Sequence, residues 1–145
     1  MRTIGKQVEV PAAIDAVWTS WTTAAGVCEM GPPEAWVEPR VGGAYEWYFM
    51  PEAPPGLRGA ERCRILALLP PRLLVFSWNA PPTIPRLRAA GARTQVILEL
   101  EDRGPRTGLR LTQLIDGTGE DWDAYIDYFD AAWGRVLDNL LSNHG

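Results

Sequence analysis

Aromatic side chains with regular spacing are the residues of this chain best suited to chemistry. Near Trp47 and Phe76, aromatic residues occupy every second position, which places them on one face of a strand. Near the end of the chain they recur every three or four residues, which places them on one face of a helix. Rings on facing surfaces form concave apolar sites that bind small molecules. The predicted ligand-binding residues are Tyr45, Trp47, Phe49, Phe76, Trp78, Leu98, Leu111, Gln113, Trp122, Tyr125, Ile126, Phe129 and Trp133.

Gln113 is the polar amide within this set. It shares a predicted strand face with Leu109 and Leu111, so its side chain is expected to point inward. A buried amide that loses its hydrogen bonds costs about 1–3 kcal/mol. Gln113 is therefore either bonded to tyrosine hydroxyls or available to a ligand, and Tyr45 and Tyr125 offer similar hydroxyls.

Residues that commonly perform catalysis or bind metals are few. The only histidine, His144, lies beside the end of the chain in a segment expected to fray, which removes histidine-based triads and metal sites. Cys28 and Cys63 have no metal-like spacing and are expected to be reduced and buried. No catalytic residue, metal or cofactor is predicted. An enzyme would need a buried group of strongly shifted pKa, for which Glu61, Glu46 and Arg64 are the strand residues to examine.

Charge and hydropathy disfavour other partner classes. The net charge is −4, and the basic residues come closest to clustering only at Arg86, Arg88 and Arg93, so no nucleic-acid partner is expected. No apolar run approaches the roughly 18 residues of a membrane span. The first ten residues lack the hydrophobic region of a signal peptide, which predicts a cytoplasmic location. The length fits one domain, residues 1–145.

Hydrophobic periodicity predicts the elements that position the aromatic residues. Strands are expected at 3–10, 35–38, 45–50, 59–69, 73–78, 94–101 and 107–113, with two short helices at about 13–21 and 23–27. A proline-rich loop is expected at 80–92, and an amphipathic helix at 120–141 with Thr118 as its cap. Gly134 inside that helix is expected to permit close packing. The order favours an α+β fold in which the long helix covers one face of an antiparallel sheet.

Several motifs together resemble the AHSA1-type family, the proteins similar to the activator of the Hsp90 ATPase. They are Val10-Pro11, Val17-Trp18, Thr22, Val41-Gly42-Gly43-Ala44-Tyr45, Pro70-Pro71-Arg72-Leu73, Phe76-Ser77-Trp78, Thr94-Gln95-Val96, the segment 107–113, and Trp133 with Leu137 and Leu140.

The resemblance spans essentially the whole chain and implies the helix-grip fold of the START-like, Bet v 1-like (SRPBCC) superfamily. In that fold a curved antiparallel sheet of about six or seven strands surrounds a long C-terminal helix and encloses an apolar cavity, with two short helices after the first strand. The chain departs from the family at 27–30, where a tryptophan is common, and at Gln113, where histidine is frequent.

The resulting interpretation is a protein that binds a small hydrophobic or amphipathic molecule between sheet and helix, with access gated by the Ala80–Ala92 loop and the Pro51–Gly56 turn. A co-chaperone of Hsp90 is a disfavoured alternative, because that protein uses a further N-terminal domain for which 145 residues leave no room. A hydrolase, cyclase or dehydratase acting in the same cavity is the other alternative. Exposed Trp36 or Tyr48 would suit a homodimer.

Overall fold

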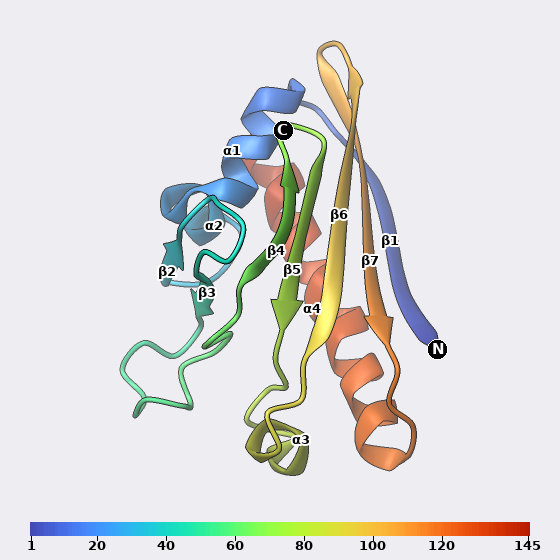
Figure 1. The fold of residues 1–145 in the computed structure, drawn as a ribbon. Helices are drawn as coiled ribbons and strands as arrows, with labels where there is room; N and C mark the ends of the chain where they lie inside the picture. The colour runs from blue at the N-terminus through green and yellow to red at the C-terminus, as the bar shows by residue number, and fades with distance from the viewer.

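A curved antiparallel sheet and a long helix dominate the computed structural model, which describes residues 1–145 (Figure 1). The elements in chain order are β1 (Arg2–Val10), α1 (Ile14–Thr22), α2 (Ala24–Glu29), β2 (Glu34–Val37), β3 (Tyr45–Tyr48), β4 (Ile65–Leu69), β5 (Leu73–Trp78), α3 (Pro85–Ala89), β6 (Thr94–Arg103), β7 (Arg106–Ile115) and α4 (Glu120–His144). This order confirms the predicted α+β class. None of the four helices is both long and apolar enough to cross a membrane.

The seven strands divide between two sheets. Five form one sheet in the order β1-β7-β6-β5-β4, and β2 and β3 form a separate pair. A bridge between Ala44 and Arg64, with a backbone hydrogen bond of 2.9 Å from Tyr45 N–H to the Cys63 carbonyl, joins the pair to the β4 edge. All seven predicted strands are therefore present, but they form two sheets joined at this bridge rather than one continuous sheet.

Helix α4 crosses the face of the five-stranded sheet (Figure 1). It buries much of the predicted aromatic stripe. Its buried residues are Tyr125, Phe129, Trp133, Val136, Leu137 and Leu140. Ion pairs from Arg2 to Asp123 (2.6 Å) and from Lys6 to Asp130 (3.0 Å) connect its outer face to β1. This packing is the helix-grip arrangement.

Two segments differ from the sequence prediction because of backbone conformation. The strand expected at 59–69 begins only at Ile65, since Gly59 and Arg62 have φ values of +148° and 64° that interrupt a strand. A Cβ atom at Gly59 would also collide with the Trp47 carbonyl oxygen. The loop expected at 80–92 contains the short helix α3, which has Pro85 in its first turn.

Three expectations about α4 are wrong. Gly119, without a side-chain hydrogen bond, takes the N-cap position in place of Thr118. A Cβ atom at Gly134 would meet no atom within 4 Å beyond the adjoining residues and backbone of its own helix, so this glycine does not permit a close contact with another element. The helix continues through His144, whose Nε2 lies 2.9 Å from the Ser20 hydroxyl oxygen, so that this last turn is tied to α1.

Candidate ligand-binding site

A buried hydrogen-bond network surrounds the amide of Gln113. Its Nε2 donates to the Thr94 hydroxyl at 2.9 Å and to the Tyr125 hydroxyl at 3.1 Å, while its Oε1 accepts from Trp133 Nε1 at 2.8 Å. The Tyr125 hydroxyl donates in turn to the Asn79 carbonyl at 3.0 Å, and burial raises its pKa. Gln113 is therefore bonded to Tyr125 of α4. Tyr45 lies outside the network and donates to the Trp21 carbonyl at 2.7 Å.

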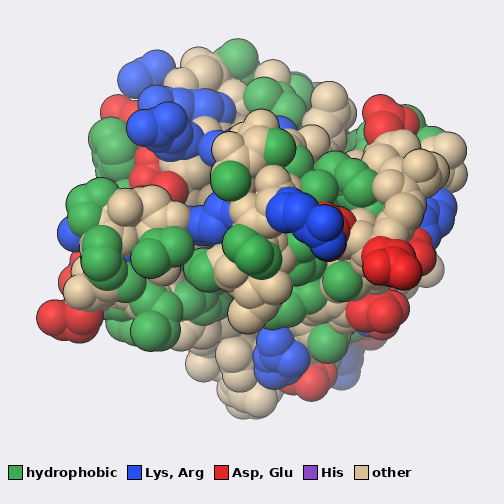
Figure 2. Space-filling model, turned by 90° about the horizontal axis from the view of Figure 1, so that it is seen from below, with side chains coloured by type: hydrophobic (Ala, Val, Ile, Leu, Met, Phe, Trp, Pro, Cys, Tyr) green, Lys and Arg blue, Asp and Glu red, His purple; other side chains and the backbone are tan.

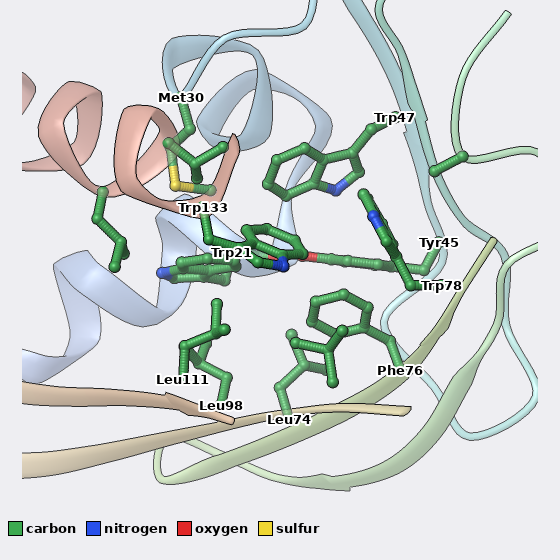
Figure 3. Close-up of a cluster of buried hydrophobic side chains, with 14 of the residues drawn as sticks. Trp21, Met30, Tyr45, Trp47, Leu74, Phe76, Trp78, Leu98, Leu111 and Trp133 are labelled. Atoms are coloured by element: carbon green, nitrogen blue, oxygen red, sulfur yellow. The ribbon is translucent and has the colours of Figure 1, made fainter. Parts of the chain in front are cut away.

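Aromatic rings fill the inner part of the space between sheet and helix (Figure 3). Trp133 reaches from α4 toward Trp47 and Trp78, with ring centroids 5.8 and 5.2 Å away, and Tyr45 packs on Phe76 at 4.5 Å. Figure 3 shows Leu74, Leu98 and Leu111 beneath these rings on the sheet side. This part of the grip is packed core.

A cavity of about 460 Å³ lies at the end of this aromatic core. Its wall comes from the end of α2, the β3–β4 segment, the segment after β5, and the middle of α4. The lining residues are Met30, Gly31, Trp47, Phe49, Met50, Leu57, Arg58, Gly59, Ala60, Trp78, Asn79, Pro81, Pro82, Arg88, Tyr128, Phe129, Ala132, Trp133, Arg135, Val136 and Asn139.

Five of the thirteen predicted residues line this cavity, namely Trp47, Phe49, Trp78, Phe129 and Trp133. The other eight lie elsewhere: Tyr45, Phe76, Leu98, Leu111, Gln113 and Tyr125 are buried in the core, and Trp122 and Ile126 pack at its margin. The first turns of α4 do not line the cavity: there Tyr125 bonds to Asn79, just after β5, and the tilted ring of Trp122 packs on Tyr125 with centroids 5.0 Å apart. The helical part of the wall runs from Tyr128 to Asn139.

Several lining residues were missed in the sequence. Ala132 follows Phe129 by three positions, so helical spacing was the signal that could have placed it beside the aromatic stripe. Its small side chain leaves space in the cavity at that point. Arg58 and Arg88 come from irregular segments whose course no periodicity predicts. The Ala80–Ala92 loop does border the cavity, through Pro81, Pro82 and Arg88, whereas the Pro51–Gly56 turn is flanked by lining residues and contributes none itself.

An ion pair between Glu61 and Arg88 fixes the loops beside the cavity. The Glu61 carboxylate lies 3.0 Å from Arg88 and accepts backbone N–H bonds from Gly56 and Arg58, both at 2.6 Å. Although burial opposes ionisation, these bonds and the guanidinium hold the pKa of Glu61 below its ordinary value. The carboxylate thus organises the loop and lacks the raised pKa that the enzyme alternative requires.

The two thiols are free and have raised pKa values. Cys63 is buried, and burial raises its pKa to about 12, so its thiol stays protonated at neutral pH. Cys28 is half-buried, which differs from the expected full burial, and desolvation raises its pKa. Neither group has the lowered pKa of a cysteine nucleophile.

Comparisons with known proteins agree with this architecture. A protein from Mesorhizobium loti, MLL2253, has a similar structure with a TM-score of 0.73 and 20% identity, covering 97% of this chain and 95% of its own. The Aha1 dimer from Colwellia psychrerythraea gives 0.75 at 17% identity, covering 99% and 96%. An HSP90 activator from Plasmodium falciparum gives 0.74 at 15% identity, covering 97% and 94%.

The family comparison covers nearly the whole chain. No curated protein matches the sequence. The family model described as "Activator of Hsp90 ATPase homolog 1-like protein" matches residues 11–144, which include the cavity and the Gln113 network. The chain therefore belongs to the family of activator of Hsp90 ATPase homolog 1-like proteins.

Proposed function

We propose that this protein binds a small hydrophobic or amphipathic molecule in the cavity beside the aromatic core. The observation that carries the proposal is the wall itself, in which 12 of the 21 residues around about 460 Å³ are hydrophobic. Ligand sites typically enclose about 300–1,000 Å³ with mainly apolar walls and a few polar groups. The volume and composition of this cavity fall within that description.

Exposed apolar side chains at the cavity support the same function. Nine large hydrophobic residues are exposed in the chain, and four of them, Phe49, Met50, Leu57 and Tyr128, belong to the cavity wall. Single exposed apolar residues are normal on a protein surface, whereas several that gather in one place are typical of a binding site. A bound molecule would cover these side chains.

A filled-cavity variant tests the proposal. Ala132 is half-buried in the wall, and Ala132→Phe would place a ring in the space a ligand needs. Ala131 is its exposed neighbour on α4 outside the wall, so Ala131→Phe is the matched control. Titration with the neutral fluorophore N-phenyl-1-naphthylamine should give saturable binding to the wild type and Ala131→Phe, and at least about tenfold weaker binding to Ala132→Phe.

Two results would count against binding in this cavity. One is equal affinity of the three proteins for the fluorophore. The other is the absence of saturable binding to the wild type of both the fluorophore and a panel of lipids and metabolites. If Ala132→Phe does not fold, as judged by circular dichroism, Ala132→Leu adds a smaller side chain at the same place and carries the same expectation.

An interaction with an Hsp90-type chaperone is the second candidate, and family membership is the observation that favours it. The Plasmodium falciparum protein is described as an HSP90 activator, but at 15% identity the likeness concerns the fold. The cavity therefore carries the main proposal. Added to purified Hsp90, this protein is expected to leave ATP turnover unchanged, and a saturable increase would favour the chaperone function.

A further inference from the structure

We propose that the ligand of this cavity is an organic acid, with an apolar tail among the rings and a carboxylate held by Arg58 and Arg135. The inference rests on the proposed function and adds the charge of the ligand to it. Both arginines belong to the cavity wall, Arg58 from the β3–β4 segment and Arg135 from α4. They approach the cavity from elements far apart in the sequence.

The charges of the wall all have one sign. Its charged residues are Arg58, Arg88 and Arg135, with no aspartate, glutamate or lysine among the 21 lining residues. The whole chain has the opposite balance, with 18 acidic and 14 basic residues. Figure 2 views the end of the molecule that carries α3 and the β3–β4 segment, where basic and apolar side chains share the middle and most acidic ones lie toward the sides. Such a site favours an anion.

Of the three arginines in the wall, only Arg88 has most of its hydrogen-bond donors engaged within the chain. Arg88 donates to the Gly56, Ala80 and Gly59 carbonyls at 2.7, 2.6 and 3.0 Å and to Glu61 at 3.0 Å, so its guanidinium is occupied and its charge neutralised. Arg88 therefore positions the loops.

Arg58 and Arg135 keep most of their hydrogen-bonding capacity. Arg58 is half-buried, and its guanidinium makes one bond within the chain, from Nε to the Ala53 carbonyl at 2.8 Å, although a guanidinium has five N–H donors. The Arg135 side chain is exposed and makes no hydrogen bond or ion pair within the chain. A carboxylate accepts paired bonds from such groups and neutralises both charges in part.

One residue of the wall, Trp47, has an unpaired donor that is enclosed in the core. The Trp47 side chain is fully buried, and its indole N–H has no hydrogen-bond acceptor in the chain. In Figure 3 the nitrogen side of its ring faces the Trp78 ring, and the two ring centroids are 5.3 Å apart with the rings nearly perpendicular. An aromatic ring is a weaker hydrogen-bond acceptor than an oxygen atom. The donors open to a ligand are therefore those of Arg58 and Arg135, and no acidic residue of the wall would repel a carboxylate.

Three ligands with the same tail separate charge from apolar binding. Decanoate, decanol and decyltrimethylammonium would be titrated calorimetrically at neutral pH and low ionic strength, below their aggregation limits. We expect decanoate to bind the wild type about tenfold more tightly than decanol, because charge-assisted bonds are about twice as strong as neutral ones. The cationic ligand is expected to bind most weakly, and added salt should reduce the difference.

Variants assign the effect to the two arginines. In Arg58→Gln with Arg135→Gln, decanoate should lose its advantage while decanol keeps its affinity. Arg72→Gln, at an exposed arginine outside the cavity wall, is the matched control and should bind like the wild type. If the double variant does not fold, Arg135→Gln alone removes a guanidinium without hydrogen bonds or ion pairs in the chain and should weaken decanoate binding severalfold.

The possible failures differ from one another. Equal affinity for decanoate and decanol in the wild type, or an unchanged preference in the folded double variant, would overturn the assignment of an acid while leaving the cavity as a binding site. Failure of all three ligands to bind would instead contradict the proposed function on which the assignment rests.

Discussion

Gln113 illustrates at the residue scale how a buried polar group can stabilise a fold. Its inward orientation was predictable because it alternates with Leu109 and Leu111 on one strand face. Its partners were not, because the network joins β6, β7 and α4 across residues far apart in the chain. The structure gives the amide three protein partners and places it outside the cavity wall.

Replacing Gln113 should therefore reduce stability and leave ligand binding intact. In Gln113→Leu, the buried Trp133 N–H loses its acceptor, and the free energy of unfolding is expected to fall by about 2 kcal/mol in urea denaturation. Gln95→Leu, the same change at an exposed position of β6, should alter it by less than about 0.5 kcal/mol. Equal effects of the two substitutions, or a selective loss of decanol binding in Gln113→Leu, would contradict a structural role.

At the scale of elements, α4 shows both the strength and the limit of periodicity. Spacing predicted which residues share its buried face, and Tyr125, Phe129 and Trp133 are all buried there. Spacing could not show which turn meets the cavity, because that depends on how side chains of other elements fill the concave face. The first turns pack over the Gln113 network, so the cavity lies against Tyr128 to Asn139.

Gly134 gives a test of α4 that is independent of any ligand. Because a Cβ atom placed there would meet no other element within 4 Å, Gly134→Ala should raise the free energy of unfolding by about 1 kcal/mol, the usual gain in helix propensity. Thermal or urea unfolding would measure this gain. Ala131→Gly, at an exposed position of the same helix, is expected to cost a similar amount. Destabilisation by Gly134→Ala would mean that the glycine has a packing role after all.

At the scale of the whole molecule, the helix-grip fold was predictable because every long element carries a clear hydrophobic period and the motifs occur in family order. The division into two sheets was not, since it depends on positive φ values at Gly59 and Arg62 within a segment of apparent strand character. The single-domain organisation, cytoplasmic location and homodimer remain predictions. For a homodimer, Trp36 is 49% exposed, whereas the Tyr48 hydroxyl already donates to Glu46.

The most direct measurement of the central claim uses the seven tryptophans as reporters. Indole N–H signals in heteronuclear NMR, assigned with single Trp→Phe variants, would be followed during titration with decanol. Binding in the cavity predicts saturable shifts for Trp47, Trp78 and Trp133, which line it, and little change for Trp18 and Trp36, which do not. Unchanged signals of the three lining tryptophans at saturation, or a dominant shift at Trp36, would contradict the account.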